Sequence, residues 1–313
     1  MHPLVLHHYA TSPFSEKVRL ALGLKGFAWR SVTVPAVMPK PDAVALTGGY
    51  RRTPFLQIGA DVHCDSAGIC RLLERLRPEP TLWPEGTEGL CDTVAQWADQ
   101  SLFWAAVPYT LQPAGLPHVF AGLTPDGIRT FGADRAAMNP TFRRPPLHDQ
   151  GVAVMAYLGR LEAMLADGRP FLLGAVPSIA DLAAVQSVWF VRRAPPVAAT
   201  IAGFVRVAAW ADRVLAFGHG VSEPLAGADA LLMARDAGGF APTRVDPGQG
   251  FAAGDAVTVT PADYAHDAVA GRLVGLDAEE SVLERTDPRA GTVHVHFPRL
   301  GYHLHPAPAG TAP

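Results

Sequence analysis

The hydrophobic pattern of residues 1–80 predicts short elements in the order strand, helix, strand, helix, strand, strand, helix. Residues 4–9 form an apolar run with the length of a buried strand, and residues 29–34 alternate between apolar and polar as a second strand does. Between them, Val18 and Leu22 recur at the spacing of one helical face. The first part of the chain is therefore predicted to be an α/β unit.

A hairpin and a further helix complete this unit. Residues 53–58 are typical of a third strand, and Pro54 stands near its start, where a proline does not cost a ladder hydrogen bond. Gly59 opens a tight turn before a short antiparallel strand at residues 62–64. Asp65 then begins another helix. This order of elements is the thioredoxin-like pattern.

Helical periodicity dominates after residues 81–89, a stretch rich in Pro, Glu and Gly that is typical of a linker between domains. Ser178 and Asp181 have the spacing of a capping box, in which each side chain bonds a backbone N–H at the start of a helix. The helix that follows is apolar nearly all round, so we expect it at the centre of an all-α bundle. The predicted helices cover residues 90–102, 124–135, 148–165, 179–191 and 201–217.

Near residue 237 the period changes from helical to alternating. Short strand patterns separated by turn residues are typical of a small barrel or a mini-sheet. They cover residues 255–260, 272–276, 281–285 and 292–297. We therefore predict a thioredoxin-like domain at residues 1–80, an all-helical domain at 90–236 and a small β-barrel-like extension at 240–308.

Composition and charge narrow the class of protein. The net charge is −3 and there is no basic stripe, so we expect no nucleic-acid partner. No apolar run approaches the roughly 20 residues that span a bilayer, and the N-terminus lacks the pattern of a secretory signal, so we expect a cytoplasmic protein that does not bind membranes. The three cysteines have no CxxC spacing, which argues against a zinc or dithiol motif.

The turn at residues 10–15 has the features of an anion site. Ser12 is a strong N-cap residue, and Pro13 falls at the first helical position. Free backbone N–H groups and the positive end of the helix dipole would then face the end of the preceding strand. An ordinary capped helix has the same features, so both interpretations stay open at this point.

Four segments of the chain resemble those of cytosolic glutathione transferases, and they occur in the same order as in that family. They are residues 12–19, 52–56, 64–66 and 177–182. The resemblance extends from residue 1 to about residue 220 and does not include the β-rich C-terminal region. It implies glutathione as a co-substrate, a small electrophile as the second substrate, and a homodimer.

The resemblance also implies how the thiol is activated. The thiolate of glutathione is the nucleophile, and lowering a thiol pKa by two units requires roughly 2.7 kcal/mol of differential stabilisation. Ser12 matches the position of the family's activating hydroxyl, so it is the predicted catalytic residue. Thr11 is the alternative hydroxyl, and Tyr9 is a weaker third choice.

Glutathione binding is implied for a second set of positions. Asp65 would face the ammonium of the γ-glutamyl end, and Ser66 would hold its carboxylate at a helix start. Arg52, or else Lys40, would meet the glycyl carboxylate, while a cis bond would present the backbone of Thr53 to the ligand. A plain helix cap and a solvated loop remain the alternatives for these residues. The full predicted set is Phe14, Arg52, Thr53, Pro54, Asp65 and Ser66.

Two histidine pairs in the β-rich region are candidate metal ligands. His294 and His296 share one strand face, and His303 and His305 alternate in the same way. No cysteine or acidic signature accompanies them, so we interpret all four as surface histidines and expect no metal.

The sequence thus predicts an enzyme that activates the thiol of glutathione for attack on an apolar electrophile. Ser12 and Ser15 stand where a dithiol oxidoreductase would have cysteines, which argues against disulfide chemistry. Two other hypotheses remain open: a binding or scaffold protein that keeps the fold without turnover, and a glutathione-dependent isomerase or lyase.

Overall fold

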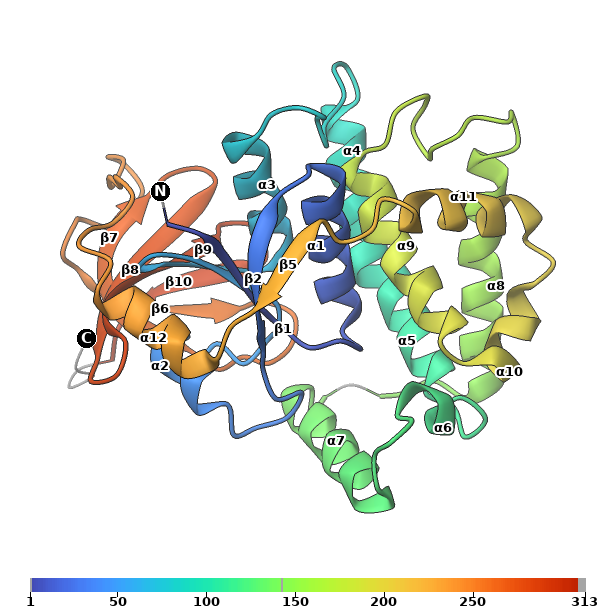
Figure 1. Cartoon of the computed structure of the whole chain (residues 1–313), viewed down its shortest axis with the longest axis horizontal. Coiled ribbons are helices and arrows are strands. Elements are labelled where there is room, and N and C mark those ends of the chain that lie inside the picture. The colour runs from blue at the N-terminus through green and yellow to red at the C-terminus, as the bar shows by residue number, and fades with distance from the viewer. Residues whose placement is uncertain (1, 142, 309–313) are drawn as a thin grey trace.

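A computed structural model describes residues 2–141 and 143–308 (Figure 1). Strands and their covering helices occupy one side of the molecule, and most of the helices from α4 to α11 occupy the other, with α7 below the junction of the two sides. None of the described helices is long and apolar enough to cross a membrane.

The first part of the chain has the predicted thioredoxin-like order. Strand β1 pairs in parallel with β2 and antiparallel with β3, and β4 pairs antiparallel with β3. The peptide bond before Pro54 is cis, as the resemblance implied. The elements are β1 (Leu4–His8), α1 (Pro13–Leu24), β2 (Ala28–Thr33), α2 (Pro41–Thr47), β3 (Phe55–Ile58), β4 (Asp61–Cys64) and α3 (Ser66–Leu76).

The second part is an all-helical region around a buried helix, α9. Asp181 closes the predicted capping box with Ser178 and also accepts hydrogen bonds from Leu172 N and Trp210 Nε1, so it joins three segments of the domain. The elements are α4 (Glu88–Trp97), the π-helical turn η1 (Ala98–Leu102), α5 (Phe103–Thr110), α6 (Leu116–Val119), α7 (Pro125–Met138), α8 (Leu147–Met164), α9 (Ile179–Arg192), α10 (Pro195–Ala198), η2 (Ala199–Ile201) and α11 (Val205–Leu215).

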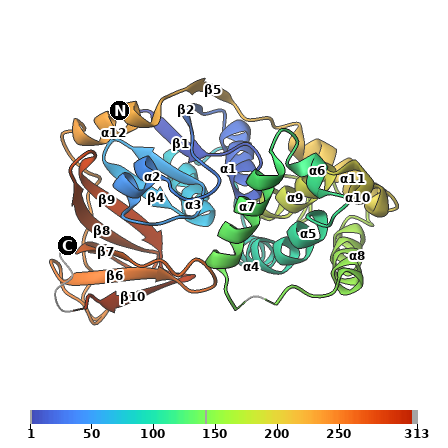
Figure 2. The ribbon, with the colours of Figure 1, turned by 90° about the horizontal axis from the view of Figure 1, so that it is seen from below.

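The C-terminal region extends the thioredoxin-like sheet at both edges. Strand β5 adds in parallel to β2, and β9 adds in parallel to β4, which gives a ten-stranded sheet with the order β10-β6-β7-β8-β9-β4-β3-β1-β2-β5. Figure 2 shows β6 to β10 continuing along the flank of the first domain. The elements are β5 (Val221–Pro224), α12 (Gly227–Arg235), β6 (Ala256–Pro261), β7 (Val269–Leu276), β8 (Glu280–Asp287), β9 (Gly291–Pro298) and β10 (Tyr302–Pro306).

The predicted β-rich region is therefore present, but among the described residues its strands form an open continuation of the sheet where we had expected a barrel-like unit. The physical reason is a shared core. Val62 and Cys64 of β4 pack in one buried cluster with Val295 and Phe297 of β9 and with Leu231 of α12. Burying this apolar face requires both regions, so the edge of β4 is covered by the chain's own C-terminal strands.

Candidate functional site

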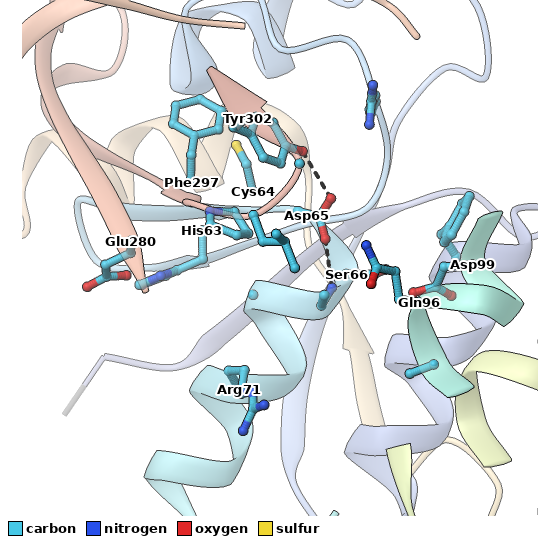
Figure 3. Close-up of a pocket in the computed structure, with 18 of the residues that line it drawn as sticks. His63, Cys64, Asp65, Ser66, Arg71, Gln96, Asp99, Glu280, Phe297 and Tyr302 are labelled. Atoms are coloured by element: carbon cyan, nitrogen blue, oxygen red, sulfur yellow. Dashed lines mark hydrogen bonds between the residues drawn. The ribbon is translucent and has the colours of Figure 1, made fainter. Parts of the chain in front are cut away.

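A cavity of about 690 Å³ lies where the first domain, the helical domain and the C-terminal strands meet (Figure 3). It is partly open to solvent, and both polar and apolar side chains line it. All the residues that the resemblance assigned to glutathione binding line it: Phe14, Arg52, Thr53, Pro54, Asp65 and Ser66.

A second cavity of about 420 Å³ adjoins the first. Phe14, Arg52, Thr53 and Tyr264 line both spaces, so the two cavities are direct neighbours. Aromatic and aliphatic side chains make up most of the second wall, including Phe103, Val107, Leu111, Phe120, Phe131 and Phe190.

Ser12 lines the second cavity, close to the residues that the two cavities share. It is the N-cap of α1, and its Oγ accepts a hydrogen bond of 3.2 Å from Ser15 N. The hydroxyl keeps its own hydrogen for donation, because the cap uses only the oxygen as an acceptor. Thr11 and Tyr9 line the same cavity, so all three predicted hydroxyls lie at this wall.

The start of α3 is organised by Asp65. Its backbone has a φ of 73°, and its Oδ1 accepts a hydrogen bond of 2.8 Å from Ala67 N. Tyr302 Oη donates to the other carboxylate oxygen at 3.0 Å, and Tyr50 Oη lies 3.0 Å from Tyr302 Oη. A tyrosine from the last strand therefore fixes the carboxylate that was predicted to meet the ammonium of glutathione (Figure 3).

A buried ion pair stands beside Ser66. Lys17 Nζ lies 2.5 Å from Asp99 Oδ2 and 3.5 Å from Ser66 Oγ, and Gln186 donates to the other oxygen of Asp99 at 2.6 Å. Burial disfavours the charge on Lys17, but the Asp99 carboxylate raises the lysine pKa above its usual value, so the lysine stays protonated. The pair ties α1 to η1 and α9 across the domain boundary.

Two predicted carboxylate-binding side chains are already engaged within the chain. Arg52 donates to the Asp263 carboxylate and to the carbonyl of Tyr264, and its guanidinium stacks on the Tyr264 ring at 3.9 Å. Lys40 donates to the carbonyl of Arg51 and to Thr53 Oγ1. Burial, with a smaller contribution from nearby cations, lowers the pKa of Lys40 to about 8.

The interpretation of all four C-terminal histidines as surface residues is wrong for one pair. His294 and His296 are buried, because β9 is an interior strand between β8 and β4, whereas His303 and His305 on the edge strand β10 are exposed. His63 of β4 stacks on His296 at 4.1 Å, and both rings line the first cavity.

Several residues of the cleft carry no signal in the sequence. Tyr264 and Tyr302 come from the C-terminal region, and Lys17 and Asp99 come from two different helices. Each is an isolated polar residue within its segment and belongs to no local motif. Only the packing of distant segments in the fold brings it to the site.

A thioredoxin-like sheet with a cis-proline loop, an attached helical domain and a two-part cleft between them define a protein of the glutathione transferase class. Models of the N-terminal and C-terminal domains of glutathione S-transferases match residues 6–81 and 135–213. The chain therefore belongs to the glutathione S-transferase family.

Individual relatives agree with this assignment. A GST-like protein from Pseudomonas syringae is 41% identical, and its structure covers 98% of this chain and 100% of its own with a TM-score of 0.81. A maleylpyruvate isomerase from a Ralstonia species is 28% identical over 194 residues, which are 60% of this chain and 82% of that protein. A beta-etherase from a Sphingobium species shares the fold alone, at 18% identity and a TM-score of 0.52 over 68% of this chain and 95% of its own.

Proposed function

We propose that this chain binds glutathione in the first cavity and activates its thiol for reaction with an apolar electrophile in the second. The observation that carries the proposal is the pair of neighbouring cavities, one with charged and polar side chains in its wall and one lined mostly by apolar side chains, which share Phe14, Arg52, Thr53 and Tyr264. A peptide with charged ends suits the first space, and an apolar substrate suits the second.

The first cavity offers a partner for each charged group at the γ-glutamyl end. The backbone N–H and hydroxyl of Ser66 lie at the start of α3, where a carboxylate is favoured by the helix dipole. Asp65 and Asp99 line the same cavity and supply carboxylates for the ammonium. The cis-proline loop would present the backbone of Thr53 to the cysteinyl residue.

Ser12 is the proposed catalytic residue. With the hydroxyl donating to sulfur at the N-terminus of α1, both the hydrogen bond and the helix dipole favour the thiolate. Thr11 lines the same wall and is the alternative donor. Formation of a homodimer remains a prediction from the family.

The test compares Ser12→Ala with Thr11→Ala, with glutathione affinity measured by calorimetry and turnover measured against a panel of electrophiles. We expect Ser12→Ala to bind glutathione almost unchanged and to lose about 10²–10³-fold in kcat/KM, as for loss of one transition-state donor. The ultraviolet absorbance of bound thiolate should fall with it. Binding without turnover across the panel favours a scaffold protein, and no binding at millimolar glutathione contradicts the proposal altogether.

A second candidate function is a glutathione-dependent isomerisation of a substrate that carries a carboxylate. The apolar cavity is lined by Lys40 and Arg144, which, in the part of the chain that the structure describes, donate to carbonyl and hydroxyl oxygens and have no carboxylate partner. A cation in an apolar space is stabilised by an anionic ligand. The similarity to a maleylpyruvate isomerase supports the same candidate function.

Lys40→Met and Arg144→Met separate the two candidates. For a carboxylate-bearing substrate we expect KM to rise about tenfold or more, since a charge-assisted contact is lost. For a neutral apolar electrophile the two variants should leave KM unchanged. Equal effects on both substrate classes would exclude this role for the two cations.

A further inference from the structure

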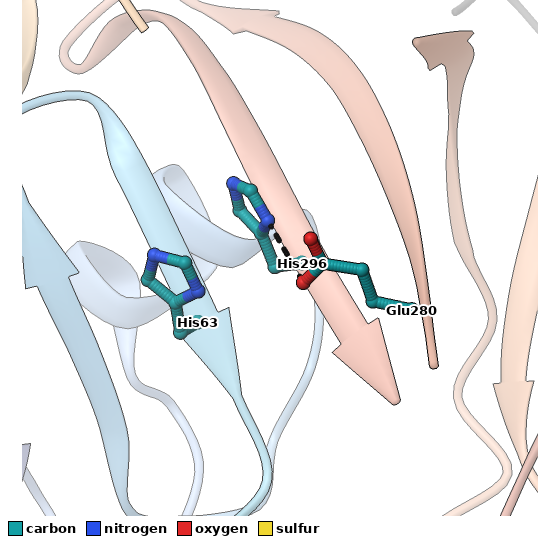
Figure 4. A group of neighbouring side chains, drawn as sticks. All are labelled: His63, Glu280 and His296. Carbon is teal, nitrogen blue, oxygen red and sulfur yellow. Dashed lines mark ion pairs between the residues drawn. The ribbon is translucent and has the colours of Figure 1, made fainter. Parts of the chain in front are cut away.

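We propose that His63, His296 and Glu280 form a binding site for one divalent transition-metal ion, with Zn²⁺ as the expected occupant. The three residues come from β4, β9 and β8, which are neighbours in the sheet (Figure 4). Their candidate ligand atoms all lie within 4.8 Å of one another. The site goes beyond the proposed thiol chemistry and does not depend on it.

The register of the sheet brings these three side chains together. His63 and His296 are directly opposite each other on β4 and β9, and their rings stack at 4.1 Å. Val282 of β8 is opposite His296, so Glu280 lies one side-chain step away on the same face. The strands on either side hold all three positions in place.

Asp61 fixes the orientation of the His296 ring. Its Oδ1 lies 3.0 Å from His296 Nε2, and its Oδ2 accepts a hydrogen bond of 2.8 Å from Ala241 N. A carboxylate accepts hydrogen bonds, so Nε2 carries a proton. A carboxylate that holds the far nitrogen of a ligating histidine is the usual outer partner of a metal site.

The other nitrogen of His296 faces a carboxylate without a hydrogen bond between them. His296 Nδ1 is buried and has no hydrogen-bond partner, and Glu280 Oε2 lies 3.4 Å from it. If the ring is neutral, this nitrogen carries a lone pair, and it repels the carboxylate unless a cation lies between them. Two ligands with bonds of about 2.0–2.1 Å in a tetrahedral Zn²⁺ site are about 3.4 Å apart, which matches this separation.

The donor set and its surroundings fit the same ion. Two imidazoles and one carboxylate are a common three-residue set for Zn²⁺, with the fourth position left for water or substrate. All three residues line the first cavity, which gives an ion a path from solvent. Figure 3 shows His63 and Glu280 on the side of Asp65 away from Asp99, so the metal would not occupy the proposed position of the glutathione ammonium.

A proton is the rival occupant of this space. Burial opposes a charge on His296, but Asp61 and Glu280 raise its pKa above the usual value, so an imidazolium held between two carboxylates is a coherent alternative. A proton at this position leaves no site for an ion, and the two occupants are therefore separated by direct metal binding.

The experiment strips the full chain with a chelator and titrates it with Zn²⁺ by calorimetry, with the visible absorbance of Co²⁺ as a probe of tetrahedral coordination. We expect one ion per chain with a dissociation constant in the micromolar range or below. Glu280→Gln and His296→Ala should each weaken binding at least tenfold, and Asp61→Asn should weaken it about 10–100-fold. Glu280 is partly exposed, so its conservative variant tests the site even if His296→Ala does not fold.

The matched control is the double variant His303→Ala with His305→Ala, which removes the exposed histidine pair on β10. It should bind Zn²⁺ as the wild type does. Loss of binding in this control, or binding that survives Glu280→Gln and His296→Ala, would show an adventitious surface site and overturn the proposal. So would no binding at about 100 µM Zn²⁺, since structural sites bind far more tightly.

Discussion

The two halves of the ten-stranded sheet contribute different chemistry to one cleft. The β1–β4 half presents two helix starts, at Ser12 and Asp65, and the backbone beside Pro54. The β6–β10 half presents side chains, among them Tyr302 and His296. Under the proposed function, the backbone groups would bind the peptide ligand, and side chains from the added strands would set what surrounds it.

The two halves also depend on each other for stability. The apolar cluster that joins β4 to β9 belongs to neither half alone. Tyr302 crosses the junction to reach Asp65, and Arg52 crosses it in the other direction to reach Asp263 and Tyr264. We therefore expect the halves to fold together, and the predictions below test how tightly they are coupled.

Deletion of the chain from residue 237 onward should have the largest effect on stability. It removes β6 to β10, exposes the edge of β4 and leaves Val62 and Cys64 without their apolar partners on β9. We expect an aggregating chain with no cooperative thermal unfolding. Recovery of a soluble, cooperatively unfolding fragment that binds glutathione would show that the first half is independent.

Lys17→Met should cost about 3–5 kcal/mol of unfolding free energy, because it leaves Asp99 without its cation in a largely buried position. Denaturant unfolding measures this loss. Arg30→Met is the matched control, since Arg30 and Glu223 form an exposed ion pair between β2 and β5, and it should cost less than about 1 kcal/mol. Similar losses in the two variants would mean that the Lys17 pair does not join the domains as described.

The sequence predicted the order of elements up to α3 and the caps at Ser12 and Ser178. These features are local, because strand and helix periods and cap residues act within a few positions. The pairing of β9 with β4 and the contact of Tyr302 with Asp65, 237 residues away, are not local. An alternating pattern fixes which face of a strand is buried but not which strand lies beside it, so the sheet extension and its side chains were missed.

Acidification should weaken the first half through His7 on β1. Burial lowers the pKa of His7 to about 4, so the unfolded chain binds a proton there between about pH 6.5 and pH 4 while the folded chain does not. The contribution of neutral His7 to the unfolding free energy is fully present above pH 6.5. It falls by on the order of 2–3 kcal/mol as the pH drops to about 4.

The check is denaturant unfolding of wild type and His7→Asn across this range of pH. The unfolding free energy of the variant should depend less steeply on pH than that of the wild type. The two slopes should differ by about 1.4 kcal/mol per pH unit, the contribution of one proton. Parallel slopes for the two proteins would mean that His7 is protonated in the folded state.

Tyr302→Phe should have the smallest effect of the set. It removes the hydrogen bond of 3.0 Å to Asp65 and keeps the buried ring. We expect glutathione to bind about 3–10-fold more weakly, which corresponds to about 1 kcal/mol for one lost hydrogen bond. Calorimetry measures the change, and Tyr157→Phe on α8 is a control that should bind as wild type does.

The most direct test of the central claim is a crystal structure of the chain with glutathione. We predict that the sulfur lies within about 3.5 Å of Ser12 Oγ. This distance allows for the slightly greater length of hydrogen bonds to sulfur. The γ-glutamyl carboxylate should lie at the backbone N–H of Ser66. A glutathione whose sulfur contacts neither Ser12 nor Thr11, or whose γ-glutamyl end lies away from α3, would contradict the account.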